Sequence, residues 1–128
     1  MQGKLDGVEE KLEPMYKTMA KDLVKQRSRL GGNWAIAQAV FSRKQRELLR
    51  SIIGPDLVFI VISMTEECNI ARIKKRGNMG EYTEALIKYA KLCEPAGDDE
   101  ENAFNVVVTE EMSIDDVMGK VLEIVQKL

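Results

Sequence analysis

The segment from Gly54 to Gly77 constrains the fold of this chain more than any other. It begins with the turn signal Gly54-Pro55, and residues 57–62 form an unbroken apolar run, Leu-Val-Phe-Ile-Val-Ile. A strand that is apolar on both faces is typical of a parallel sheet covered by helices, because an antiparallel sheet usually leaves one face in water. The run therefore predicts a buried strand of an α/β domain.

A helix with recognisable ends is predicted directly after this strand. Thr65 suits the N-cap position, and Glu66 and Glu67 follow in the first turn, where the helix dipole favours carboxylates. Residues 74–76, Lys-Lys-Arg, occupy the last turn, where the dipole favours cations, and Gly77 ends the helix. A buried strand followed by a helix is half of a βαβ unit, so we expect parallel neighbours elsewhere in the chain.

Composition excludes several classes of protein. The chain has 128 residues, 45% of them hydrophobic and 31% charged, which suits one modest globular domain. Its net charge of -2 provides no bulk attraction to nucleic acid or to an anionic membrane, so neither partner is expected. No apolar run approaches the roughly 20 residues that span a bilayer, and the N-terminus lacks the pattern of a signal peptide.

The cysteine and histidine content restricts the chemistry. Cys68 and Cys93 are the only cysteines, and two such thiols are neither a disulfide framework nor a metal set. They indicate reduced core thiols and a cytoplasmic protein. Because the chain has no histidine, it cannot by itself provide a histidine base, a Ser-His or Cys-His pair, or a His-ligated zinc.

The remaining elements follow from apolar spacing and from Gly and Pro signals. Residues 1–11 are expected to be flexible, and residues 12–128 to form a single domain. Helices are predicted over 12–30, 43–53, 66–76, 82–93 and 114–128, and strands over 33–40, 57–62 and 104–108. Strands that alternate with helices predict a three-layer αβα domain around a short parallel sheet of three strands.

Polar side chains at the carboxyl ends of these strands are the first candidates for a site, since ligands of open α/β sheets bind there. Gln38, Arg43 and Arg46 follow the first predicted strand, and the two arginines lie one helical turn apart. Such a pair can bind a carboxylate or a phosphate, or it can simply be a solvated helix face, which without other evidence is the favoured interpretation. Further polar residues at this edge are Ser42, Ser63, Thr65 and Thr109.

Three other sequence features can likewise be interpreted as part of a site or as ordinary structure. Arg72 and Arg76 can bind an anion or be surface cations, and the helix dipole already accounts for Arg76. The acidic run at residues 98–101 can hold a divalent cation, but such a run is more often a solvated loop. The chain has no G-x-x-x-x-G-K-[ST] and no G-x-G-x-x-G motif, and Gly31-Gly32 precedes a strand rather than a helix.

Four segments, in order, resemble the C-terminal part of gluconokinase-like members of the P-loop nucleoside-kinase-type proteins. Residues 35–50 resemble that family's strand and the Arg-rich helix after it, and residues 56–63 its next core strand. Residues 71–77, Ala-Arg-Ile-Lys-Lys-Arg-Gly, resemble the entry to its lid, and residues 92–100 its L-E-P-P-x-x-D-E segment. The resemblance covers about three quarters of the chain and implies a truncated P-loop kinase-like fold.

The resemblance also implies roles for the candidate arginines. By position, Arg43 and Arg46 would face the phosphoryl acceptor, and Arg72 and Arg76 would belong to the lid over nucleotide phosphates. Gln38, which follows the same predicted strand, is grouped with Arg43 and Arg46 as a substrate-binding candidate. The chain departs from the family in lacking the first strand and the phosphate-binding loop, so positioned phosphoryl transfer is not expected from this chain alone. No cofactor is then expected, whereas ATP and magnesium would be required if an upstream segment supplied the loop.

Smaller departures occur within the matched segments. Ser42 stands where the family has a lysine, and Asn78 and Met79 stand where it has histidine and phenylalanine.

The missing strand has a structural consequence. In the resembled family it lies between the counterparts of residues 33–40 and 57–62, so its absence leaves unpaired strand edges and an apolar face. Either residues 33–40 pair with residues 57–62, or a second chain supplies the cover, and the helix over residues 12–30 is long enough to dock on it. We expect a homodimer or a complex with another protein.

Three functions remain open from the sequence. The first is a catalytically silent kinase-like domain that binds itself or another protein. The second is a piece of a small-molecule kinase whose phosphate-binding loop comes from an upstream segment or another chain. The third is a binding module for a small anion.

Overall fold

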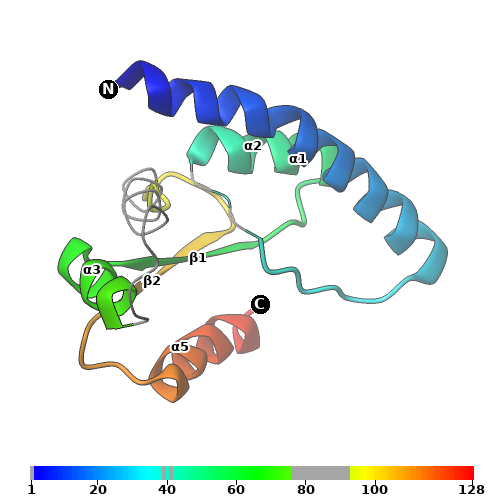
Figure 1. Ribbon diagram of the computed structural model, residues 1–128. Coiled ribbons are helices and arrows are strands. Elements are labelled where there is room, and N and C mark those ends of the chain that lie inside the picture. The colour runs from blue at the N-terminus through cyan, green and yellow to red at the C-terminus, as the bar shows by residue number, and fades with distance from the viewer. Residues whose placement is uncertain (1, 39, 41, 76–92) are drawn as a thin grey trace. The chain divides into compact units, whose positions relative to one another are not determined.

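The computed structural model describes residues 2–38, 40, 42–75 and 93–128 (Figure 1). The chain divides into two compact units, Met1–Leu57 and Val58–Leu128. The helix predicted over residues 82–93 and the candidate Arg76 lie outside the described residues, apart from Cys93. A single domain over residues 12–128 stays a prediction.

Two packed helices make up the first unit. Helix α1 spans Gln2–Leu30 and packs against helix α2, Arg43–Ile53. Helix α1 begins at Gln2, earlier than the predicted start at residue 12, so the segment expected to be flexible is helical from its second residue. The most buried apolar side chains of this unit are those of Tyr16, Ala20 and Leu49.

Both ends of the segment between these helices are set by local hydrogen bonds. Gly31 has a φ of 68° and donates its N–H to the Arg27 carbonyl, 2.7 Å away, which is a left-handed C-cap that ends α1. Ser42 is the N-cap of α2 in a capping box, because its hydroxyl accepts from the Gln45 N–H and the Gln45 side chain accepts from the Ser42 N–H. The predicted helix stop and the predicted N-cap are confirmed.

The prediction of a strand over residues 33–40 is wrong for the residues of this segment that the structure describes. Residues 33–38 and Val40 have no regular secondary structure, and residues 33–38 are exposed. The indole N–H of Trp34 donates to the Gly31 carbonyl at 2.9 Å, a contact within the loop. The pattern is suited to a strand, but a strand also needs a neighbour for its backbone groups, and none of the described residues supplies one.

A two-stranded parallel sheet forms the centre of the second unit. Strand β1, Phe59–Met64, pairs with strand β2, Ala103–Val108, in a register that runs from Phe59 opposite Ala103 to Met64 opposite Val108. These strands were predicted over 57–62 and 104–108, so β1 begins two residues later than expected. The mixed α/β class and the parallel pairing are confirmed, but among the described residues the sheet has two strands and not three.

One helix packs on each strand. Helix α3, Glu66–Lys75, packs against β1, and helix α5, Ile114–Gln126, packs against β2. Their predicted N-caps are confirmed, because the Thr65 hydroxyl accepts from the Cys68 N–H and Ser113 forms a capping box with Asp116. Buried apolar side chains from these elements form the core of the unit: Val61, Cys68, Ile73, Val106 and Val108.

The loop before β2 is held by Asn105 of β2 and by a carboxylate of its own. Asn105 donates to the Ala96 carbonyl and accepts from the Ala96 N–H, both at 2.8 Å. Within the acidic run, Glu100 is 7% exposed, and its carboxylate accepts from the Gly97 N–H. The solvated-loop interpretation therefore fails for Glu100, which is part of a turn, while the other three acidic side chains of residues 98–101 are exposed.

Candidate functional site

The carboxyl ends of β1 and β2 meet at one edge of the sheet, as the sequence predicts for parallel strands. Met64 lies opposite Val108 at the ends of the two strands, so Thr65 and Thr109 leave the sheet at the same edge. Helix α3 begins one residue after Thr65, and residues 109–113 connect β2 to α5. The polar groups of α3 and of this connection are therefore brought to the position where α/β sheets bind ligands.

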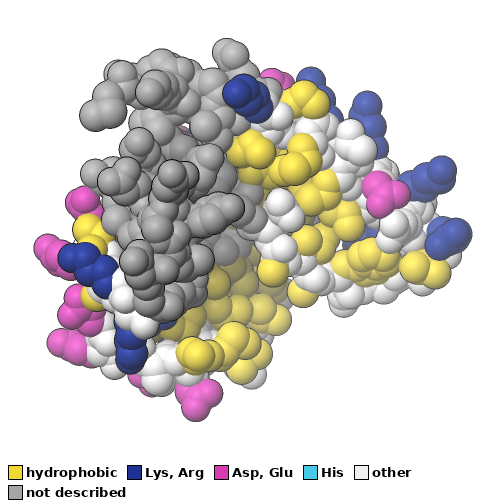
Figure 2. All heavy atoms as spheres, in the orientation of Figure 1, with side chains coloured by type: hydrophobic (Ala, Val, Ile, Leu, Met, Phe, Trp, Pro, Cys, Tyr) yellow, Lys and Arg dark blue, Asp and Glu magenta, His cyan; other side chains and the backbone are white. Residues whose placement is uncertain are grey.

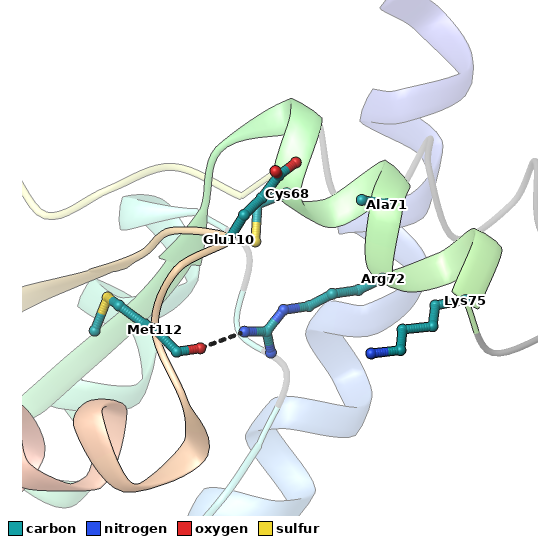
Figure 3. A pocket seen from close by; sticks show the side chains of 6 residues that line it. All are labelled: Cys68, Ala71, Arg72, Lys75, Glu110 and Met112. Carbon is teal, nitrogen blue, oxygen red and sulfur yellow. Dashed lines mark hydrogen bonds between the residues drawn. The ribbon is translucent and has the colours of Figure 1, made fainter.

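An open hollow of about 480 Å³ lies between α3 and this connection (Figure 3). Among the described residues, Cys68, Ala71, Arg72 and Lys75 line it from the helix, and Glu110 and Met112 line it from the connection. Spacings of three and four residues place the four helical side chains on one face of α3, which is why this face lines the hollow.

Arg72 and Lys75 bring two positive charges to the hollow. Arg72 is half-buried, and its Nη2 donates to the Met112 carbonyl across a long 3.4 Å contact. A guanidinium has several N–H donors, so this bond orients the group and leaves donors for a ligand. Figure 3 shows the Lys75 side chain reaching to the same side of α3 as Arg72. This arrangement suits a small anion, such as a carboxylate or a phosphate.

Cys68 and Glu110 occupy the other end of the hollow. The thiol of Cys68 is fully buried and forms part of the wall. Figure 3 shows the Glu110 carboxylate turned away from the Arg72 guanidinium, so it does not neutralise that cation in a direct ion pair. At the arginine end, the charged side chains that the structure describes in the lining, Arg72 and Lys75, are both positive.

The two arginines of α2 have different environments. Arg46 is 1% exposed and is among the largest fully buried side chains of the described residues. The interpretation of this arginine as part of a solvated helix face is therefore wrong. Arg43 is half-buried, and its Nε lies 3.0 Å from Oε1 of Glu47, an ordinary i, i+4 ion pair of a helix surface. Binding of a phosphoryl acceptor by either arginine stays a prediction.

The remaining candidates belong to different units of the chain. Gln38 is exposed in the irregular segment of the first unit, while Arg72 belongs to the second unit. Sequence reasoning found Arg72 but missed Lys75, Cys68 and Met112 as lining residues. The spacing of Cys68, Arg72 and Lys75 was a usable signal for one helix face, whereas the main-chain carbonyl of Met112 had none.

The resolved pKa shifts lie outside this hollow. The backbone N–H of Ser113, followed by its hydroxyl, holds the pKa of Asp116 below its ordinary value, and burial raises the pKa of Tyr16. Among the described residues, no three side chains of Cys, Asp or Glu gather closely enough to hold a metal ion. In the same part of the chain, none of the helices is long and apolar enough to cross a bilayer.

Comparisons with protein-family models, with curated proteins and with solved structures found no match to this chain.

Proposed function

We propose that this chain is a kinase-like α/β domain without a phosphate-binding loop, which does not transfer phosphate by itself and acts by associating with a second polypeptide. A second copy of the chain is the first candidate for that polypeptide, and another protein is the alternative. The proposal is supported by the two-stranded sheet of the described residues, in which β1 pairs on one side alone, and by the four family-like segments of the sequence. A cytoplasmic location is part of the same proposal.

The free edge of β1 is the observation that carries the proposal. Phe59 donates its N–H to the Asn102 carbonyl at 2.8 Å, on the side of β2. Backbone groups alternate along a strand, so the N–H groups of Ile60 and Ile62 face away from β2. Among the described residues β1 pairs with β2 alone, and the resemblance assigns the missing strand to this edge.

The side chains near this edge are apolar and accessible. On β1, Ile62 is 49% exposed and Met64 38%, while Phe104 and Val107, 39% and 48% exposed, lie on β2 and not at this edge. Strand β1, Phe-Ile-Val-Ile-Ser-Met, contains no charge and no proline, which are the usual devices that prevent edge-to-edge pairing. An unprotected apolar edge favours pairing with a further strand, and a two-fold dimer would supply one from the same β1.

Light scattering after size exclusion tests the proposal at micromolar concentrations. We expect a dimer for the natural chain and a shift to monomer for Ile62→Lys, since a lysine on an edge strand opposes pairing. Val107→Lys is the matched control, because Val107 has nearly the same exposure but lies on β2. A natural chain that stays monomeric, or two variants that behave alike, would contradict pairing through β1.

A second candidate function is favoured by the hollow beside Arg72 and Lys75. In this alternative the chain is part of an ATP-dependent small-molecule kinase, and an upstream segment or another chain provides the phosphate-binding loop and the magnesium site. A third possibility, a module for a small anion, uses the same hollow without the loop.

Thermal unfolding with Mg-ATP and with inorganic phosphate separates these candidates. A ligand at 100 times its dissociation constant stabilises the folded state by about 2.7 kcal/mol. The proposed function predicts no shift with millimolar Mg-ATP. A shift with Mg-ATP alone favours the kinase piece, and an equal shift with phosphate favours the anion module.

A further inference from the structure

An exposed apolar row runs along helix α5. Ile114, Met118, Leu122 and Val125 follow at spacings of four, four and three residues, so they form one line, here called the outer stripe. Their side chains are 77%, 49%, 50% and 48% exposed, whereas Val117, Val121 and Ile124 form a separate half-buried row. Figure 2 shows apolar side chains gathered over the part of the molecule where α5 lies. Packing against β2 therefore uses only part of the apolar surface of this helix.

The row next to the outer stripe is acidic. Each of its positions follows a stripe position by one residue, and it contains Asp115, Gly119, Glu123 and Gln126. It has two carboxylates and no cation. Lys120, the one lysine within α5, lies on the opposite side of the helix from the stripe, about 150° away at 100° per residue.

Gly119 leaves a position without a side chain in the acidic row. A Cβ at Gly119 would meet nothing within 4 Å, so no packing contact among the described residues requires a glycine here. Glycine inside a helix is nevertheless less favourable than alanine by about 1 kcal/mol. A small residue beside an exposed apolar stripe allows a second helix to approach closely.

We propose that the outer stripe docks an amphipathic helix of another protein, whose apolar face is flanked by lysines or arginines. The inference deepens the proposed function and rests on it, since it identifies the chemistry of one protein partner. The acidic row favours this partner over a second α5. An antiparallel two-fold pair of α5 helices would place Asp115 and Glu123 against the same row of the copy, where like charges repel.

Two synthetic peptide helices test the charge preference directly. Both carry leucines at stripe-like spacing, one with lysines and the other with glutamates on the flanking positions. Fluorescence anisotropy should show that the lysine peptide binds the natural chain about tenfold or more tightly than the glutamate peptide. Added salt should reduce this difference, because exposed charges are screened.

Variants of α5 separate the stripe from its charged flank. Met118→Gln with Leu122→Gln should weaken binding of the lysine peptide by about tenfold or more, and Lys120→Gln, on the opposite side, should leave it unchanged. Glu123→Lys should reduce or reverse the preference between the two peptides. Circular dichroism of each variant checks that the helices are retained, so that a lost site is distinguished from a lost fold.

Each contrary result overturns the inference without deciding the proposed function. Equal binding of the two peptides, no binding of either, or unchanged binding by the stripe variant would contradict a basic partner at this surface. A dimer that the stripe variant converts to monomer would show that a second copy occupies α5. That result would still support self-association of the chain. A natural chain that is monomeric but binds the lysine peptide would support this inference and exclude self-pairing through β1.

Discussion

Two segments with strand-like sequences have different outcomes in this molecule. Residues 59–64 form β1 and pair with β2 over six residues, whereas residues 33–38, Asn-Trp-Ala-Ile-Ala-Gln, are exposed and irregular. Both have apolar side chains, but β1 has the richer β-branched run and a parallel neighbour within its own unit. The comparison teaches that an apolar pattern makes a strand possible, while a partner for its backbone N–H and C=O groups makes it form.

The largest expected loss of stability separates the two segments and comes from a charge in the sheet core. Val106→Asp places a carboxylate at a side chain that is 2% exposed, and we expect a loss of about 4 kcal/mol or more, or no folding of the second unit. Ile36→Asp, at a residue that is 50% exposed, should change stability by less than about 0.5 kcal/mol. Urea unfolding followed by circular dichroism measures both, and equal losses would mean that residues 33–38 are packed as a strand is.

The next largest effect is expected within α2, which follows the irregular segment. Arg46→Ala should cost about 1–3 kcal/mol, because the buried guanidinium and its stem lose their packing and polar contacts. Arg43→Ala removes a partly exposed ion pair and should cost less than about 1 kcal/mol. Chemical denaturation of the two variants tests this order. If Arg46→Ala is as mild as Arg43→Ala, the arginine is available for a ligand and is not a structural group.

Helix caps allow the two units to be compared directly. Ser42→Ala and Ser113→Ala each remove the hydroxyl of a capping box, and each should cost about 1 kcal/mol. Thermal unfolding of the single variants provides the measurement. A much larger loss for Ser42→Ala would indicate that the first unit depends more on local helix capping than the second, which has a sheet.

The cap of α5 also predicts a pH dependence with a defined sign. Hydrogen bonds from Ser113 lower the pKa of Asp116 from its ordinary value of 3.8, so the carboxylate is favoured in the folded state. The stabilisation is complete above that ordinary value and is lost as the pH falls through the lowered pKa. Helicity followed during acid titration should decline less steeply in Asp116→Asn than in the natural chain. Identical acid titration curves for the two proteins would show that the Asp116 carboxylate does not contribute to the pH dependence of stability.

The smallest expected change is a gain in stability. Gly119→Ala should raise the free energy of unfolding by about 0.5–1 kcal/mol, since alanine is the better helix former and its methyl group meets nothing within 4 Å. Thermal unfolding measures the gain, and a loss instead would mean that the position is more crowded than the structure shows.

Much of the second unit could be predicted from sequence because its signals are local. The apolar run, Thr65, the Ser113–Asp116 capping box and the last strand were each recognisable without tertiary information. The failed strand over residues 33–40 depended on a neighbour that no local pattern reveals. The early start of α1 was not predicted, because residues 1–11 are mostly polar and include Gly3 and Gly7, and glycine is a poor helix former.

The candidate site was predictable only in part. Arg72 was found from its place in a lid-like motif, and the carboxyl edge followed from the parallel order of the strands. The burial of Arg46 could not be foreseen, since charge pattern alone suggests a solvated face. The exposure of the outer stripe was also unexpected, because a clean amphipathic pattern indicates a buried face but not how much of that face its own chain covers.

Amide hydrogen exchange of β1 at low and high protein concentration tests the central claim, that an unfilled edge of this sheet is the place of association. The account predicts that the N–H groups of Ile60 and Ile62, which face away from β2, become protected as the concentration rises, while Phe59 stays protected throughout by its bond to Asn102. Protection of Ile60 and Ile62 that does not change with concentration would contradict it.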